Sequence, residues 1–189
     1  MPPAVGGGPG RYAVSRLDAA LERIQRCDER LCLRCNRVLR YRALPQVCRA
    51  ISWLGNGVFW YALMLALLLS KSGAALPVLH MAGAGLACTL AYKVLKRSTL
   101  RPRPYQVHAS IAQGASPLDT FSFPSGHTLH ATAFSLVALA YYPSLMVLLA
   151  PFTLLTAASR VVLGLHYPSD VLAGAALGAL IAAASFALV

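Results

Sequence analysis

The chain has 189 residues, of which 57% are hydrophobic and 12% charged, and its mean hydropathy is +0.59. Soluble domains carry about 25% charged residues, so this chain has too few charges to cover a water-facing surface. The composition excludes an ordinary soluble globule, a disordered chain, a collagen and a coiled coil, and it indicates a polytopic membrane protein.

The net charge is +11, from 17 basic and 6 acidic residues. Ten of the 14 arginines lie between Arg11 and Arg49, and no aromatic interleaving or nucleic-acid motif accompanies them. We therefore expect membrane lipids with anionic headgroups as the partner of this segment, and no nucleic acid.

The first predicted element runs from Val14 to about Arg42, where apolar residues recur every three or four positions, interrupted at Asp28, with arginines on the other faces. This pattern predicts an amphipathic helix that lies in the membrane interface and serves as a brace without chemistry. We expect residues 1–50 to form a basic amphipathic arm and residues 51–189 a transmembrane domain. The apolar positions are Leu17, Leu21, Ile24, Leu31, Cys35 and Val38.

Four of the five cysteines lie in the arm. The pair Cys32-x-x-Cys35 fits half of a zinc site or a redox pair, but the arm offers no histidine and no second pair at zinc spacing. We expect reduced thiols on a cytoplasmic face and no bound metal. The other two cysteines of the arm are Cys27 and Cys48.

Five apolar stretches after the arm, uncharged except for Lys93 in the second, approach the roughly 20 residues that a helix needs to cross a bilayer. They predict an all-α, polytopic transmembrane helical bundle of five spans, or six if the arm hides a crossing near residues 31–50. Pro143 separates the third and fourth spans in a tight hairpin, and Pro151 is expected to kink the fourth. The spans are Ile51–Ser70, Leu76–Leu95, His127–Tyr142, Leu145–Ser159 and Val171–Val189.

Small residues concentrate in the second span at residues 82–85 and in the fifth at Gly174-x-x-x-Gly178. Small faces let transmembrane helices approach closely, so both spans are expected inside the bundle. Packing within one chain is favoured over a dimer through Gly174 and Gly178, and the oligomeric state stays open.

A first polar cluster follows the second span as a basic strap, Lys96 to Pro104, which holds four cations in eight residues. Two prolines keep this strap extended, and fixed cations suit a phosphate. The strap is equally typical of a positive-inside flank or a patch that binds lipid headgroups.

A second cluster, Phe123 to His127, precedes the third span. Ser125 is placed as a helix N-cap, so the amides of Gly126 and His127 would favour an anion, although a plain capped helix explains the pattern too. His130, one turn further on, is expected to be a packed or hydrogen-bonded core histidine.

A third cluster links the last two spans and contains Arg160, His166 and Asp170. An arginine can bind phosphate, and a carboxylate four residues after a histidine can orient its ring. Alternatively, Asp170 is an ordinary acid in the first turn of a helix capped by Ser169. The order of the spans places all three clusters on one membrane face, in one composite site that is poor in metal ligands.

These residues resemble the three signature motifs of the type-2 phosphatidic acid phosphatase superfamily, which includes membrane lipid phosphatases and soluble vanadium haloperoxidases. All eleven fixed positions match, between Lys96 and Asp170, and the membrane spans favour the lipid phosphatase branch. The motifs are Lys96-x6-Arg103-Pro104, Pro124-Ser125-Gly126-His127 and Ser159-Arg160-x5-His166-x3-Asp170.

The resemblance implies that His166 attacks phosphorus to form a phosphohistidine, with Asp170 holding its ring. His127 would protonate the leaving oxygen and then help to activate water. The phosphoryl oxygens would be bound by Lys96, Arg103, Ser125, Gly126 and Arg160. The resemblance implies no cofactor and no metal.

The expected function is hydrolysis of a phosphate or pyrophosphate headgroup on a membrane lipid, such as phosphatidic acid, phosphatidylglycerol phosphate, undecaprenyl pyrophosphate or a lipid A phosphate. A phosphate-lipid transferase and a non-catalytic protein that binds anionic lipids are the alternatives. The resemblance favours a bacterial inner membrane and a periplasmic site. The positive-inside rule and the free thiols favour the cytoplasmic face, but we expect the family's orientation, with the site at the periplasmic face.

Overall fold

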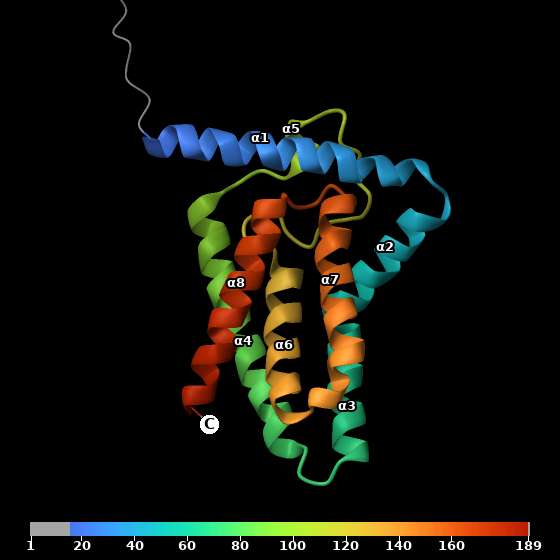
Figure 1. The fold of residues 1–189 in the computed structure, drawn as a ribbon, viewed down its shortest axis with the longest axis vertical. Coiled ribbons are helices and arrows are strands. Elements are labelled where there is room, and N and C mark those ends of the chain that lie inside the picture. The colour runs from blue at the N-terminus through green and yellow to red at the C-terminus, as the bar shows by residue number, and fades with distance from the viewer. Residues whose placement is uncertain (1–15, 189) are drawn as a thin grey trace, which may run out of the picture.

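The computed structural model describes residues 16–188, and within this range every regular element is helical (Figure 1). The predicted beginning of the interfacial helix, Val14, and the first arginine, Arg11, lie outside the described residues. The helices are α1 Arg16–Asn36, α2 Ala43–Trp53, α3 Phe59–Ser70, α4 Ala75–Thr99, α5 Pro104–Val107, α6 Gly126–Tyr141, α7 Met146–Val162 and α8 Pro168–Ser185. Short turns, Arg37–Arg40, Leu54–Val58, Pro143–Leu145 and Phe186–Leu188, join or end them.

The helices form a bundle around α6, which packs against α4, α7 and α8 (Figure 1). Within residues 16–188, four segments are long and apolar enough to span a membrane: 43–70, 75–107, 143–162 and 168–188. The shorter α6 runs between them and buries half of its side chains, so we treat it as the fifth crossing. The chain is a multi-pass membrane protein with an all-α bundle, as predicted.

The first span begins earlier than predicted, at Ala43 instead of Ile51. The predicted boundary after residue 50 therefore falls inside α2. Among the described residues, positions 31–50 contain the end of α1, a short turn and the start of α2, with no separate crossing. A π-helical turn at Leu54–Val58 joins α2 to α3, and Gly57 there has a φ of 116°, a conformation that favours glycine.

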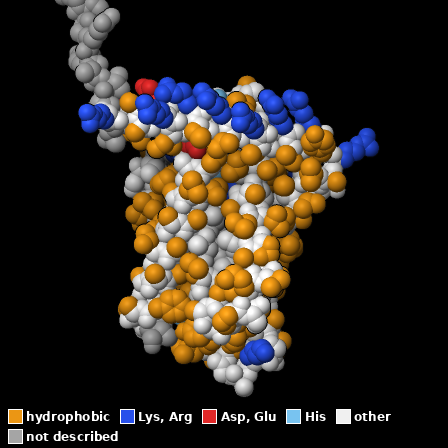
Figure 2. All heavy atoms as spheres, in the orientation of Figure 1, with side chains coloured by type: hydrophobic (Ala, Val, Ile, Leu, Met, Phe, Trp, Pro, Cys, Tyr) orange, Lys and Arg blue, Asp and Glu red, His pale blue; other side chains and the backbone are white. Residues whose placement is uncertain are grey.

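Helix α1 lies across the end of the bundle where α4 and α7 end and α6 and α8 begin (Figure 1). Its predicted apolar residues Leu21, Ile24 and Leu31 are exposed, as an interfacial helix requires. Figure 2 shows basic side chains, all of them arginines in α1, along this helix and hydrophobic side chains over the bundle beyond it. The face of α1 turned to the bundle buries two polar residues, Asp28 and Asn36, together with Cys32, which packs in an apolar cluster with Val161 and Tyr167.

The small residues of α8 pack against α6. A Cβ atom built on Gly174 would lie 2.6 Å from the carbonyl oxygen of Ser125, and one on Gly178 would lie 2.3 Å from that of Leu129. This close approach of two backbones confirms that these glycines serve packing within the chain. In α4, Gly85 faces a side chain instead, with a Cβ placed there 2.7 Å from the ring of Phe134, and Gly83 has open space around it.

We expect Gly178→Ala to destabilise the protein by about 1–3 kcal/mol, because the added methyl group clashes with the backbone carbonyl of Leu129, which cannot move aside as a flexible side chain could. The matched control is Gly83→Ala, which has room for the methyl group and gains up to about 1 kcal/mol of helix propensity. Thermal unfolding of the detergent-solubilised variants measures the difference. Equal melting temperatures for the two variants would contradict this packing.

Candidate active site

The three predicted clusters meet at the α1 end of the bundle, around a cavity of about 430 Å³. Lys96 comes from the last turn of α4, Arg103 from the residue before α5 and Arg160 from the last turn of α7. The cavity is lined by six of the predicted site residues: Lys96, Arg103, Gly126, His127, Arg160 and His166. The other two, Ser125 and Asp170, are fully buried outside the cavity lining.

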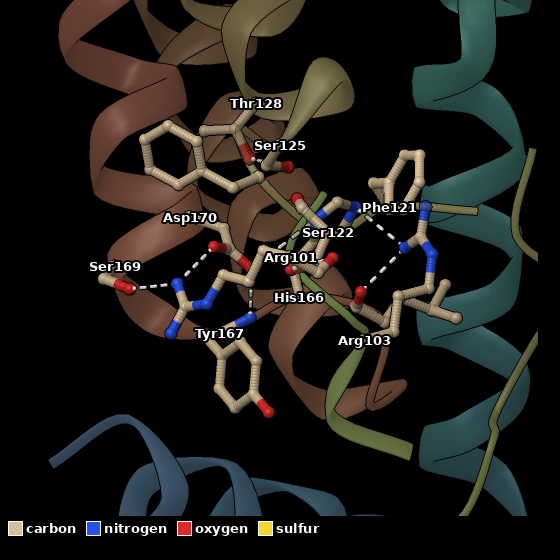
Figure 3. A network of polar contacts seen from close by, with 12 residues as sticks. Arg101, Arg103, Phe121, Ser122, Ser125, Thr128, His166, Tyr167, Ser169 and Asp170 are labelled. Carbon is tan, nitrogen blue, oxygen red and sulfur yellow. Dashed lines mark hydrogen bonds and ion pairs between the residues drawn. The ribbon is translucent and has the colours of Figure 1, made fainter. Parts of the chain in front are cut away.

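His166 is almost fully buried between α7 and α8 (Figure 3). Its Nδ1 atom lies 2.6 Å from the carbonyl oxygen of Ser122, and its Nε2 atom lies 3.3 Å from Nη1 of Arg103. A carbonyl oxygen only accepts and a guanidinium only donates, so these partners place the proton on Nδ1 and leave the lone pair on Nε2. That lone pair accepts from the guanidinium of Arg103, a predicted phosphate-binding residue.

Burial and the positive charges of Arg160, Arg103 and Lys96 hold the pKa of His166 well below its usual range. The hydrogen bond to Ser122 works in the opposite direction and does not outweigh them. The imidazole is therefore neutral at physiological pH, which is the state in which it can act as a nucleophile.

Asp170 makes no direct hydrogen bond to His166, because the Ser122 carbonyl takes the Nδ1 proton. Its Oδ2 atom is 3.8 Å from Nδ1 and accepts the backbone N–H of Tyr167 at 2.8 Å. The role of Asp170 in holding the His166 ring thus stays a prediction. At this distance Asp170 would act on the ring through its charge and not through a direct hydrogen bond. Helix α8 begins at Pro168, so Ser169 is inside the helix and is not its N-cap.

Ser125 is the N-cap residue of α6, as predicted, but its hydroxyl pairs with the Thr128 hydroxyl at 3.0 Å instead of with a backbone amide. The first amides of a helix have no partner within the helix, so those of Gly126 and His127 remain for an anion. His130 is hydrogen-bonded to the Gly126 carbonyl and to Thr89, as predicted, but it is only partly buried and also lines the cavity.

Arg160 is buried, and its Nη1 atom donates to the hydroxyl of Ser52 in α2. Its buried Nε has no hydrogen-bond partner among residues 16–188. Leaving a charged donor unsatisfied is costly, and an anionic oxygen in the cavity would relieve that cost. This unpaired donor supports the predicted role of Arg160 in binding phosphate.

Asp119, in the loop between α5 and α6, also lines the cavity, and the sequence interpretation missed it. One of its oxygens, Oδ1, accepts from Lys96 Nζ at 2.6 Å and from Arg103 Nη2 at 2.7 Å. The sequence does contain a signal that could have identified Asp119, because Asp119 and Asp170 are the only acidic residues after residue 50. Burial would raise the pKa of Asp119, but the bonds and charges of Lys96 and Arg103 outweigh it and lower that pKa.

Asp119 therefore stays ionised at physiological pH and occupies two cations that a phosphate would need. We expect Asp119→Asn to strengthen inhibition by inorganic phosphate or vanadate about tenfold, because the neutral amide competes less for Lys96 and Arg103. Inhibition constants of the variant and the wild type measure the effect, with Asp18→Asn in α1 as the control. Unchanged or weaker inhibition would show that Asp119 does not compete with phosphate.

Among residues 16–188, no group of three or more His, Cys, Asp or Glu side chains is arranged to hold a metal ion. All five cysteines are unpaired. Cys32 is buried and donates to the carbonyl oxygen of His166 at 3.6 Å, and burial raises the pKa of its thiol to about 12. Cys32 is thus a packed thiol beside the site.

The family model of the PAP2 superfamily matches residues 74–189, which include all three motifs. The chain belongs to this superfamily, as the motifs indicated.

Two named relatives match about half to two thirds of the chain. The chain is 42% identical over 106 residues to decaprenylphosphoryl-5-phosphoribose phosphatase of Mycobacterium tuberculosis, covering 54% of this chain and 56% of the relative. To the protein of the same name from Mycolicibacterium smegmatis it is 35% identical over 130 residues, covering 67% and 68%. The first match thus spans little more than half of its relative's length.

The fold is similar to the crystal structure of a transmembrane PAP2-type phosphatidylglycerolphosphate phosphatase from Bacillus subtilis. The TM-score is 0.71 at 27% sequence identity, and the match covers 90% of this chain and 89% of the other. The similarity therefore extends over the bundle as well as the motifs.

Proposed function

We propose that this protein is an integral-membrane lipid phosphatase that works without a metal ion, through a phosphohistidine on His166. One observation carries the proposal: the unprotonated Nε2 of a buried histidine faces a cavity that three fixed cations and a second histidine share. Electrostatic stabilisation by fixed cations is the main contribution available for phosphoryl transfer.

In the first step, His166 Nε2 attacks phosphorus, an N–P bond forms and the bond from phosphorus to the lipid oxygen breaks. His127 gives its proton to the departing alkoxide. Lys96, Arg103 and Arg160, with the first amides of α6, stabilise the charge on the phosphoryl oxygens.

In the second step, water attacks the phosphohistidine and the N–P bond breaks. His127, now unprotonated, takes the proton of that water, and inorganic phosphate leaves. The protons balance over the cycle, and His166 returns to its starting tautomer.

The substrate we propose is a membrane lipid with a phosphate or pyrophosphate headgroup. The cavity extends from the cations past apolar side chains of α3, α4 and α6, which include Trp60, Leu86 and Phe134. A headgroup would meet the cations while its acyl or isoprenoid chain stays among apolar groups. The mycobacterial relatives are named for a polyprenyl-linked substrate and the Bacillus subtilis neighbour for a glycerolipid, so both classes belong in the assay.

The test is release of inorganic phosphate from short-chain phosphatidic acid, phosphatidylglycerol phosphate and an isoprenyl pyrophosphate, with and without a metal chelator. We expect turnover of at least one lipid, undiminished by the chelator and lost in His127→Ala. Lipid binding without turnover would instead indicate a non-catalytic protein, and transfer of phosphate to an added alcohol in place of water would indicate a transferase.

We propose that the protein resides in a bacterial inner membrane and that its site faces the cytoplasm. The resemblance favoured a periplasmic site, but the arm and the site share one end of the bundle, and the described residues offer no extra crossing between them. In the described loops at the opposite end, Lys71 is the one cation, so the positive-inside rule supports a cytoplasmic site.

Single cysteines in a cysteine-free background test the orientation. Ser116→Cys marks the exposed loop at the site, and Ser72→Cys is the matched position at the opposite end. We expect an impermeant thiol reagent to label Ser72→Cys in spheroplasts and Ser116→Cys only after lysis. The reverse pattern would place the site in the periplasm.

A further inference from the structure

Asp28 of α1 is a buried acid in the most basic segment of the chain, with 3% of its surface exposed. The sequence pattern treats it as a break in an apolar stripe, yet the structure turns it toward the bundle. Its Oδ2 atom accepts from Arg101 Nη2 at 2.8 Å and from the Ser169 hydroxyl, and its Oδ1 atom accepts the Ser169 backbone N–H at 2.9 Å. Both partners of this carboxylate, Arg101 and Ser169, lie beside Asp170.

Arg101 connects the two buried carboxylates (Figure 3 shows its contacts to Asp170 and Ser169). Its Nη1 atom donates to Asp170 Oδ1 at 2.5 Å and to the Ser169 hydroxyl at 2.8 Å, and its guanidinium stacks over the ring of Tyr167 at 4.1 Å. Arg101 is not among the residues that line the cavity, so its cation serves the carboxylates and not the phosphate.

Two further residues on the same face of α1 contact the segment that carries His166. They follow Asp28 at intervals of four, the spacing of one helix face. Cys32 donates to the His166 carbonyl, and Asn36 donates to the carbonyls of Val162 and Ala112. Helix α1 thus contacts both ends of the loop between α7 and α8, through Asn36 at Val162 and through Asp28 at Ser169.

We propose that Asp28 is a positioning residue for the reaction, acting through Arg101 and Asp170 on His166. By holding Arg101 at its Nη2 atom, Asp28 keeps the Nη1 atom of the same guanidinium on Asp170, so that Asp170 stays fixed 3.8 Å from His166 Nδ1. This inference rests on the proposed phosphatase function, and it makes the N-terminal helix part of the catalytic unit instead of a brace.

The first test is a set of kinetic variants on whichever lipid the wild type hydrolyses. We expect Asp28→Asn to lower kcat by about 10–100-fold at an unchanged KM, as for other groups that orient a reacting side chain. Asp28→Glu should restore part of the loss, and Glu22→Gln, an exposed acid of the same helix, should have no effect. If Asp28 acts through Arg101, the double variant Asp28→Asn/Arg101→Met should be no slower than Arg101→Met alone.

The second test does not depend on turnover. It measures the ring ¹⁵N signals of His166 by NMR of the protein labelled with ¹⁵N-histidine. We expect the His166 ring signals to shift in Asp28→Asn and to stay in place in Glu22→Gln. Thermal unfolding curves check that both variants are folded. A shifted spectrum in a protein without phosphatase activity would support the positioning role and refute the proposed function. Unmoved His166 signals, or additive losses in the double variant, would overturn the inference.

Discussion

Replacing His166 with alanine is expected to lower kcat by about 10⁴-fold or more, because the substitution removes the atom that bonds to phosphorus. Its Nε2 atom is the unprotonated ring nitrogen at the cavity, and His127 activates water only after the phosphohistidine has formed. The loss should appear in kcat, with KM for the lipid little changed, since the three cations that bind the headgroup remain. Phosphate release under saturating lipid measures it.

The matched control is His108→Ala. His108 lies on the same face of the protein, 3.6 Å from Glu29, and does not line the cavity, so its loss should leave turnover near that of the wild type. Gel filtration checks that both variants remain monodisperse. Turnover by His166→Ala within tenfold of the wild type would refute His166 as the nucleophile.

Replacing Arg103 with alanine should have the second large effect on activity. We expect this substitution to lower kcat/KM by about 10²–10³-fold. Arg103 is fully buried and donates to Asp119, to the carbonyl of Leu165 at 2.7 Å and to Nε2 of His166. A guanidinium that already touches the nucleophile lies where charge develops on the phosphoryl group, so its contribution grows in the transition state. Initial rates at low lipid concentration give the change.

Two further substitutions serve as controls for Arg103→Ala. Arg97→Ala removes an exposed cation from the same basic strap and should change kcat/KM less than threefold, because the charge is screened by solvent. Arg103→Lys keeps the charge but loses the two-pronged geometry, so we expect an intermediate rate. Equal losses in Arg97→Ala and Arg103→Ala would mean that the strap acts only as a general attraction for anionic lipids.

The order of spans along the sequence was enough to predict the site. Because successive crossings alternate in direction, the ends near Lys96, His127 and Arg160 had to share one face, and the structure brings these residues to one cavity. The scarcity of charge after residue 50 made each remaining ionisable residue informative. The Gly174 and Gly178 pair likewise predicted a close helix contact, which α6 and α8 make.

Contacts between distant segments could not be predicted in the same way. Asp28 and Arg101 are 73 positions apart, and a helix pattern gives no reason to turn an acid inward unless its partner is known. The Ser122 carbonyl that fixes the His166 tautomer has no side-chain signature at all. Asp119 lies in a loop without periodicity, so its position over Lys96 and Arg103 depends on how that loop folds back.

The central claim, a phosphohistidine on His166, is tested most directly by trapping the intermediate. The protein is mixed with a ³²P-labelled lipid substrate, quenched in base within milliseconds to seconds, digested and sequenced. We predict a label that is stable in base and lost in acid, carried by the peptide that contains His166 and absent from His166→Ala. Turnover of the lipid with no such label, or a label on another residue, would contradict this account.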